Sequence, residues 1–314
     1  MTSAGYRPTV PPVSASLPVD SGRSTPSQRR RRPDSKRSTV LTVGIWTCVA
    51  YFLLPLVWLL ISSTKNNSDL FSSFGFWFGH TFSLWDNLTT LFTQQNGVFL
   101  LWSLNTVTYS LTSAVGAAFL ATAAGYGFAM YRFPGGKAIF SGILGSIMIP
   151  ATALAIPTYL LFAAAGVTNT PFAVIVPSLL SPFGVFLMRV YAADAIPKSL
   201  LEAARIDGAG EYRIFFQVSV RLLGPGIVTV FLFALVSTWN NYFLPLIMLS
   251  NPKLFPLTVG LAQLQAASEG GGGSEALFST VITGSLVSVV PLVIAFLYLQ
   301  RYWQSGLATG GVKE

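Results

Sequence analysis

The chain has 314 residues, of which 52% are hydrophobic and only 10% are charged, and its formal net charge is +8. A soluble globular protein carries about 25% charged residues, so this composition could not supply a water-facing surface. The chain also holds too much apolar surface to stay disordered as a whole. Its single Cys and single His exclude a disulfide framework and a multi-ligand Cys/His metal site. The composition predicts a protein that lies mostly in lipid, with no metal and no cofactor.

Residues 1–38 differ from the rest of the chain. They are rich in Ser and Pro and contain an unbroken arginine run at positions 29–32. Segments of this kind bury too little apolar surface to fold, and their positive charge attracts anionic lipid. We predict a disordered basic cytoplasmic tail over 1–38, followed by one transmembrane domain over 39–314.

Six apolar windows are long enough to approach a membrane span, which needs about 20 residues to cross the hydrocarbon. None contains Asp, Glu, Lys or Arg. In chain order they are residues 40–62, 103–128, 139–163, 172–187, 226–249 and 276–299. The expected fold is therefore all-α, a polytopic membrane protein with six transmembrane helices.

The positive charges predict the orientation of these helices. All but two of the 19 Lys and Arg residues lie in the tail, the second and fourth connections and the C-terminus, and the exceptions are Lys65 and Lys253. Basic residues stay on the cytoplasmic side, so both termini are expected in the cytoplasm. The net positive charge thus indicates topology and not a nucleic-acid partner.

The windows lack the ionisable residues on which proton- or sodium-driven transporters depend. A phosphate-binding loop is also missing at residues 131–138, because Tyr131 replaces its first Gly and Ala138 replaces its Ser or Thr. No nucleophile, base or metal motif supports an enzyme or a catalytic residue. Any active transport must take its energy from a partner.

The fourth connection, about residues 191–225, is the most informative segment. Ser199 and Glu202 have the spacing of a capping box, and Ala203 and Ala204 favour a helix behind it. Gly208 is suited to ending that helix because glycine adopts positive φ freely. We predict a helix of about two turns, ended sharply.

A second, amphipathic helix is expected to begin near Glu211. Its polar side would carry Arg213, Gln217 and Arg221, and its apolar side Ile214, Phe215, Val218 and Leu222. Such a helix lies at a membrane surface, and residues 224–226 (Gly-Pro-Gly) would then return the chain to the bilayer. The residues alone leave open a plain cytoplasmic loop folded against its own spans.

The runs Glu202-Ala203-Ala204 and Asp207-Gly208-Ala209, with the later Gly-Pro turn, resemble the EAA loop of ABC-importer permeases. The ending over 306–313 is similar to that of maltose-type carbohydrate permeases, and the resemblance covers about residues 40–314. One departure is Arg221-Leu222, where such loops often read Leu-Pro. The resemblance implies a type I ABC-importer fold, a location in the bacterial cell membrane and a role as half of a sugar pathway.

The resemblance also implies partners and site residues. They are a second permease subunit, two cytoplasmic ABC ATPases, an extracytoplasmic solute-binding protein and the surrounding membrane lipid. A coupling helix over 200–206 would enter a cleft of the ATPase, where Glu202 would face a basic group. The coupling residues are Ser199, Leu200, Leu201, Glu202, Ala203, Ala204, Arg205, Ile206, Asp207 and Gly208.

Two further sets of residues are candidate contacts outside this loop. Trp239, Asn240, Asn241 and Tyr242 form the most polar cluster in any window and could line a sugar pathway. Helix packing and an interfacial aromatic belt would explain the same cluster. In the last outer loop the candidate contacts to a binding protein are Gln263, Gln265, Gly270 and Gly273. Against the importer stand two alternatives, a stand-alone channel or facilitator and a membrane scaffold.

Overall fold

The computed structural model describes residues 39–269 and 277–310, and these form helices without a β-strand. The expected tail over 1–38 and the residues Gly270 and Gly273 lie outside the described residues. The α-helices are α1 (Thr39–Ser63), α2 (Asn67–Ser72), α3 (Leu84–Thr93), α4 (Val98–Met130), α5 (Gly136–Ser146), α6 (Ala151–Ala164), α7 (Phe172–Ser178), α8 (Pro182–Ala195), α9 (Lys198–Ile206), α10 (Glu211–Arg213), α11 (Val220–Leu222), α12 (Gly224–Trp239), α13 (Phe243–Met248), α14 (Leu257–Glu269) and α15 (Phe278–Gly310). The 3₁₀ segments are η1 (Gln94–Asn96) and η3 (Pro252–Leu254), and η2 (Ile214–Ser219) is a π-helix. The all-α prediction is confirmed.

Two compact units divide the chain, residues 1–51 and residues 52–314. The described part of the first unit is the beginning of α1, which is apolar and exposes Val40 and Trp46. The second unit contains the rest of α1 and all the other helices.

The apolar helices agree with the six predicted windows, with two differences. In the described residues, four helical stretches are long and apolar enough to cross a membrane, namely Thr39–Ser63, Val98–Met130, Phe172–Ala195 and Phe278–Gln300. Two bent helix pairs raise the number to six if each pair is one span. One pair is α5 with α6, bent by 107°, and the other is Glu211–Leu222 with α12, bent by 79°.

The helix is interrupted within two of the predicted windows, 139–163 and 226–249. The first breaks between α5 and α6, where Pro150 precedes α6. Proline cannot donate a backbone hydrogen bond and disfavours helix in the residue before it. In the second window, α12 ends at Trp239 and a separate helix, α13, begins at Phe243. The side chain of Asn241 accepts a hydrogen bond from the Leu244 amide in the first turn of α13, at 3.3 Å.

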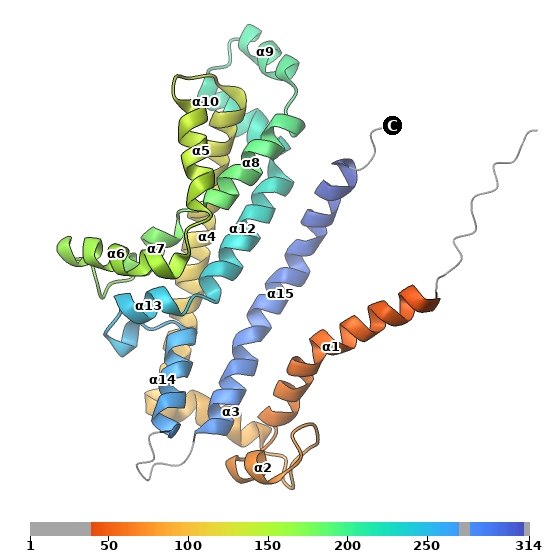
Figure 1. The fold of residues 1–314 in the computed structure, drawn as a ribbon, viewed down its shortest axis with the longest axis vertical. Helices are drawn as coiled ribbons and strands as arrows, with labels where there is room; N and C mark the ends of the chain where they lie inside the picture. Colours follow the sequence, from red (N-terminus) through yellow and green to blue (C-terminus); the bar gives the residue numbers. More distant parts are fainter. Residues whose placement is uncertain (1–38, 270–276, 311–314) are drawn as a thin grey trace, which may run out of the picture. The chain divides into compact units, whose positions relative to one another are not determined.

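Helix α4 is the central element of the second unit and packs along α8 and α12 (Figure 1). Its inner face carries small residues, including the fully buried Ala114 and Ala117. At Gly125 a Cβ atom would lie 2.6 Å from the Met188 Cβ and 2.7 Å from the Arg189 amide nitrogen of α8. Only a glycine allows the two backbones to approach so closely.

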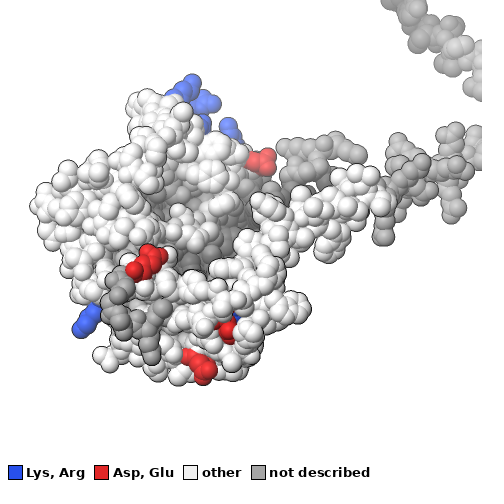
Figure 2. All heavy atoms as spheres, turned by 60° about the horizontal axis from the view of Figure 1, so that its bottom comes forward, with Lys and Arg blue, Asp and Glu red and all other residues white. Residues whose placement is uncertain are grey.

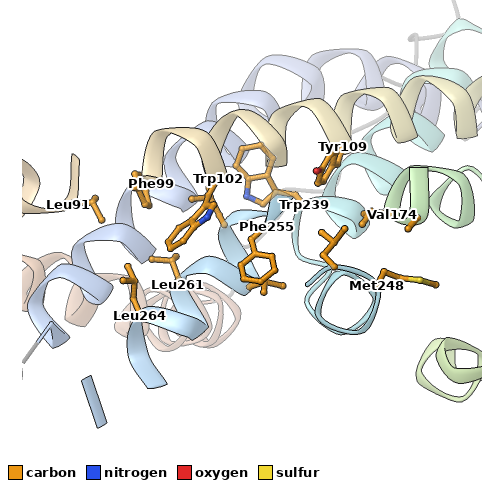
Figure 3. Packing of buried hydrophobic residues seen from close by; sticks show 14 residues of the cluster. Leu91, Phe99, Trp102, Tyr109, Val174, Trp239, Met248, Phe255, Leu261 and Leu264 are labelled. Atoms are coloured by element: carbon orange, nitrogen blue, oxygen red, sulfur yellow. The ribbon is translucent and has the colours of Figure 1, made fainter. Parts of the chain in front are cut away.

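A hydrophobic cluster joins α4 to α12, α13 and α14 (Figure 3). Its labelled members include Phe99, Trp102, Trp239, Phe255 and Leu261. Helix α14 belongs to this core, although the sequence indicated only an outer loop there. The helix was missed because residues 257–269 are too short and too polar to register as a span.

The polar residues of α4 bind the irregular segment between α13 and α14. The Trp102 indole donates to the Pro252 carbonyl at 2.9 Å, and the Tyr109 hydroxyl donates to Leu254 at 3.0 Å. The Asn105 amide donates to Lys253 at 2.8 Å and to Phe255 at 3.1 Å. Thr106 accepts from the Leu257 amide at 2.7 Å. Backbone groups that leave a helix need such partners where water is scarce.

The end of the unit that contains α2, α3 and α14 is mostly uncharged, as Figure 2 shows. Lys65, which the sequence placed in an outer loop, is buried and donates to the Phe74 carbonyl at 2.9 Å. Asn87 of α3 donates to the carbonyls of Ser63 and Lys65, each at 2.9 Å. These bonds fix the turn at the end of α1.

Candidate functional site

The helix α9 begins one residue before Ser199 and contains the predicted coupling residues up to Ile206; Asp207 and Gly208 follow its end. Its N-cap is Pro197, which makes no side-chain capping bond, so the predicted Ser199–Glu202 capping box is wrong. Proline fixes its own φ near −65°, and here φ is −64°. That conformation lets the helix start directly at Lys198, which places Ser199 inside the first turn.

The two faces of α9 differ in burial. Leu201 is 3% exposed and Ala204 is partly buried, and both pack in a cluster with Met188 of α8. The opposite face is exposed and includes Glu202 and the apolar Ile206, which is 86% exposed. Leu201 thus anchors α9 to the unit, while Glu202 and Ile206 stay accessible on its other face.

A glycine turn ends α9 as predicted. Gly208 has φ +79°, and its amide donates to the Arg205 carbonyl at 3.0 Å. The Ala209 amide donates to the Ala204 carbonyl, also at 3.0 Å. This pair of bonds is a Schellman motif, and Ala209 packs against the same cluster as Ala204. The exposed Asp207 lies at the tip of the turn.

The surface helix begins at Glu211, as predicted, but it contains the π-helix η2. A π turn holds one more residue than an α turn and so shifts the register of the residues after it. The buried residues are accordingly Ile214, Ser219 and Leu223, and Leu222 is 38% exposed. The predicted apolar face is therefore correct at Ile214 and wrong at Leu222. The predicted polar side is confirmed, because Arg213, Gln217 and Arg221 are all exposed and Arg213 donates to Gln217 at 3.0 Å.

Three elements meet at the carboxylate of Glu211. Arg205 of α9 donates through Nε at 2.8 Å, and the hydroxyl of Tyr131, the residue that ends α4, donates at 2.5 Å. The Arg205 hydrogen bond, followed by that of Tyr131, lowers the pKa of the Glu211 carboxyl. Burial and then the bond to Glu211 raise the pKa of the Tyr131 phenol. No pattern in the sequence predicts this contact, because Tyr131 and Glu211 are 80 residues apart.

The predicted substrate-pathway residues divide into two groups. Trp239 is buried and its indole donates to the Ser288 carbonyl at 3.2 Å, and the Asn241 carbonyl accepts from Thr258 at 2.8 Å. These two residues join helices. Asn240 and Tyr242 are exposed, although the Asn240 amide also donates to its own helix at Val236.

Two of the predicted binding-protein contacts lie on α14. Gln263 and Gln265 are exposed, and Gln265 donates to Glu269 at 3.0 Å. Leu261 and Leu264 of the same helix are buried. The helix therefore presents its amides outward from a fixed base.

Residues 119–306 match the family described as "Binding-protein-dependent transport system inner membrane component". The chain belongs to this family. It is thus a permease subunit of an ABC importer and not an enzyme, as the sequence predicted.

Relatives agree with this assignment over nearly the whole permease. It is 33% identical to the arabinooligosaccharides transport system permease protein AraQ of Halalkalibacterium halodurans, over 90% of this chain and 99% of the relative. It is 30% identical to the lactose transport system permease protein LacG of Rhizobium radiobacter, over 91% and 98%. A crystal structure of a bacterial ABC transporter involved in the import of the acidic polysaccharide alginate shares its fold, with a TM-score of 0.72 at 22% identity, over 84% of this chain and 94% of that one.

A cavity of about 340 Å³ lies where α4, η2 and α12 meet. Phe119, Phe215 and Phe231 contribute to its lining, and the hydroxyl of the lining residue Thr122 is bonded to the Ala118 carbonyl. This apolar cavity in the permease does not offer the hydrogen-bonding groups that a sugar requires.

Proposed function

We propose that this permease forms half of a translocation pathway for a sugar or oligosaccharide that a solute-binding protein delivers. A second, different permease would form the other half, and two ATPase subunits would bind on the cytoplasmic side, one of them at α9. The observation that carries the proposal is the exposed face of α9, with Ile206 at its tip and Leu201 as its buried root. The family supports transport, and the permease must receive its energy from outside the described spans.

The substrate class is inferred from the relatives. The names of AraQ, LacG and the melibiose/raffinose/stachyose import permease protein MelC all refer to sugars or oligosaccharides. On this proposal Asn240 and Tyr242 would contact the sugar, and Trp239 and Asn241 would hold the wall behind them. Gln263 and Gln265 would contact the solute-binding protein, together with Gly270 and Gly273.

The proposed orientation is based on the basic residues in the connections near α9. Arg132, Lys137, Arg189, Lys198 and Arg213 belong to the connections that the positive-inside rule assigns to the cytoplasm. Both termini would then be cytoplasmic, and α2, α3 and α14 would face outward. Labelling of single cysteine substitutions on intact cells with a thiol reagent that does not cross the membrane would test this orientation. A cysteine at position 265 should react, and a cysteine at position 206 should not.

Substitution of the tip of α9 tests the coupling surface. Ile206→Glu places a charge where the apolar contact is proposed, and it should release the ATPase subunits and abolish ATP-driven uptake. The control is Lys137→Gln, which makes the same change in net charge on α5 and leaves the residues of α9 unchanged. Both variants would be purified from membranes with the ATPase identified by mass spectrometry. Normal ATPase retention and uptake by Ile206→Glu would contradict the proposal.

The sugar class requires a separate experiment. Uptake of radiolabelled arabino-oligosaccharide, lactose and raffinose would be measured in a strain that lacks this permease and in the complemented strain. We expect uptake of at least one to depend on the permease and on ATP. Uptake by the permease alone in liposomes, without ATPase or binding protein, would instead identify a facilitator.

A further inference from the structure

We propose that the Glu211 carboxylate is a clamp that transmits movement of α9 to α4. The clamp consists of Arg205, Glu211 and Tyr131. This proposal rests on the proposed function, because an ATPase must first move α9. Arg205 belongs to the last turn of α9, Glu211 starts the surface helix, and Tyr131 ends α4. One carboxylate therefore receives bonds from the ends of two other elements.

The hydrogen bonds of the clamp connect Arg205 to Tyr131 through the carboxylate of Glu211. Arg205 approaches Glu211 through Nε at 2.8 Å and through Nη2 at 3.4 Å. The Tyr131 hydroxyl donates to Oε2 of the same carboxylate at 2.5 Å. Hydrogen bonds to charged groups are shorter and stronger than neutral ones. A displacement of the end of α9 thus pulls on Tyr131 through two bonds in series.

Aromatic packing continues the connection behind Tyr131. The Tyr126 ring of α4 lies 5.8 Å from the Tyr131 ring and 5.0 Å from the Phe215 ring. Phe215 in turn lies 4.9 Å from Phe216, and both rings belong to the π-helix. The end of α4 is therefore held both by the clamp and by the surface helix, so the three elements are placed to move together.

Helix α4 extends the effect to the opposite end of the unit. It has 33 residues, which at 1.5 Å per residue span about 50 Å. Its far half carries Trp102, Asn105 and Tyr109, which bind the carbonyls of residues 252–255. A pull at Tyr131 would reach that segment through one continuous helix.

The clamp can contribute only modestly to the stability of the fold. The side chains of Arg205 and Glu211 are 42% and 47% exposed, so solvent screens their charges. Loss of the pair should therefore leave the fold intact. This allows coupling to be tested without unfolding the permease.

The test uses the complete importer, with both permeases, the ATPases and the binding protein, reconstituted in proteoliposomes. ATP hydrolysis and sugar transport are measured together, and the readout is sugar transported per ATP. Tyr131→Phe removes one hydroxyl, and Glu211→Gln removes the charge. Coupling between sites typically corresponds to factors of about 5 to 150, so we expect a fall of about fivefold or more with ATPase subunits still bound. Tyr159→Phe, at an exposed tyrosine of α6, is the control and should keep the wild-type ratio.

The outcomes separate the clamp from the proposed function. An unchanged ratio in Tyr131→Phe and Glu211→Gln, with a coupled wild type, overturns the clamp alone. Equal losses of transport and hydrolysis with an unchanged ratio also overturn it, because they indicate a merely structural role. Combining the two substitutions should lower the ratio no further than either alone. A wild type that does not hydrolyse ATP or bind the ATPase refutes the proposed function instead.

Discussion

Gly125 provides the sharpest test of how α4 and α8 approach each other. A Cβ atom at this position would lie 2.6 Å from the Met188 Cβ, whereas ordinary van der Waals contact begins at 3.4 Å. The difference is about 0.8 Å, which α8 would have to yield in its backbone, since the Arg189 amide nitrogen is almost as close. Overpacking of this size costs about 1–3 kcal/mol.

Gly127 is a matched control on the same helix, because a Cβ there would meet nothing within 4 Å. In a helix interior Ala is favoured over Gly by about 1 kcal/mol. Gly127→Ala should therefore leave stability unchanged or raise it by up to about 1 kcal/mol. Gly125→Ala gains the same propensity but adds the packing cost, so the two variants should differ by about 1–3 kcal/mol.

The assay is thermal unfolding of the detergent-solubilised permease with its partners, followed by fluorescence-detected size-exclusion chromatography. We expect the midpoint of Gly125→Ala to fall below that of Gly127→Ala. Equal midpoints for the two variants, or a higher one for Gly125→Ala, would refute the close approach of α4 to α8.

Three further predictions concern the loop and the anchor of α4. Leu201→Ala leaves a cavity under α9 and should lower stability by about 2–5 kcal/mol, measured as a lower thermal midpoint together with weaker ATPase retention. An unchanged midpoint with unchanged retention would contradict the packing of Leu201. Asn105→Leu leaves the exposed Lys253 carbonyl and the part-buried Phe255 carbonyl without their donor. The bond to Phe255 should account for most of a cost of about 1–3 kcal/mol, and hydrogen exchange over 252–257 should become faster. The pKa of Glu211 is held below its ordinary value of 4.5. The ionised carboxylate therefore contributes to the free energy of unfolding above that pH, and this contribution disappears as the pH falls through the lowered pKa. Glu211→Gln should flatten this part of the pH–stability curve, and an unchanged slope would exclude the carboxylate as its source.

The sequence predicted those features of the coupling loop that depend on local chemistry. Gly208 ends α9 because a left-handed position strongly favours glycine, and this preference is visible in one residue. The predicted start of α9 was wrong because Ser199 and Glu202 have the spacing of a capping box, although the helix already begins at Lys198. The fixed φ of Pro197 decided between the two starting points.

Features that depend on tertiary structure could not be predicted. The π-helix changes the burial of Leu222 and Leu223, and no residue type marks its insertion. The contact of Tyr131 with Glu211 joins residues from separate connections. The polar cluster at Trp239 was ambiguous for the same reason, because its use in packing depends on Ser288 of another helix.

The hold of α4 on residues 252–255 is chemically one-sided. The donors are side chains of α4, whereas each acceptor is a main-chain carbonyl. Every amino acid supplies that carbonyl, so mutation of the exposed Pro252 or Lys253 does not remove an acceptor. The side chains of this surface can therefore change during evolution without loss of the acceptors, whereas a substitution at Asn105 or Tyr109 removes a donor.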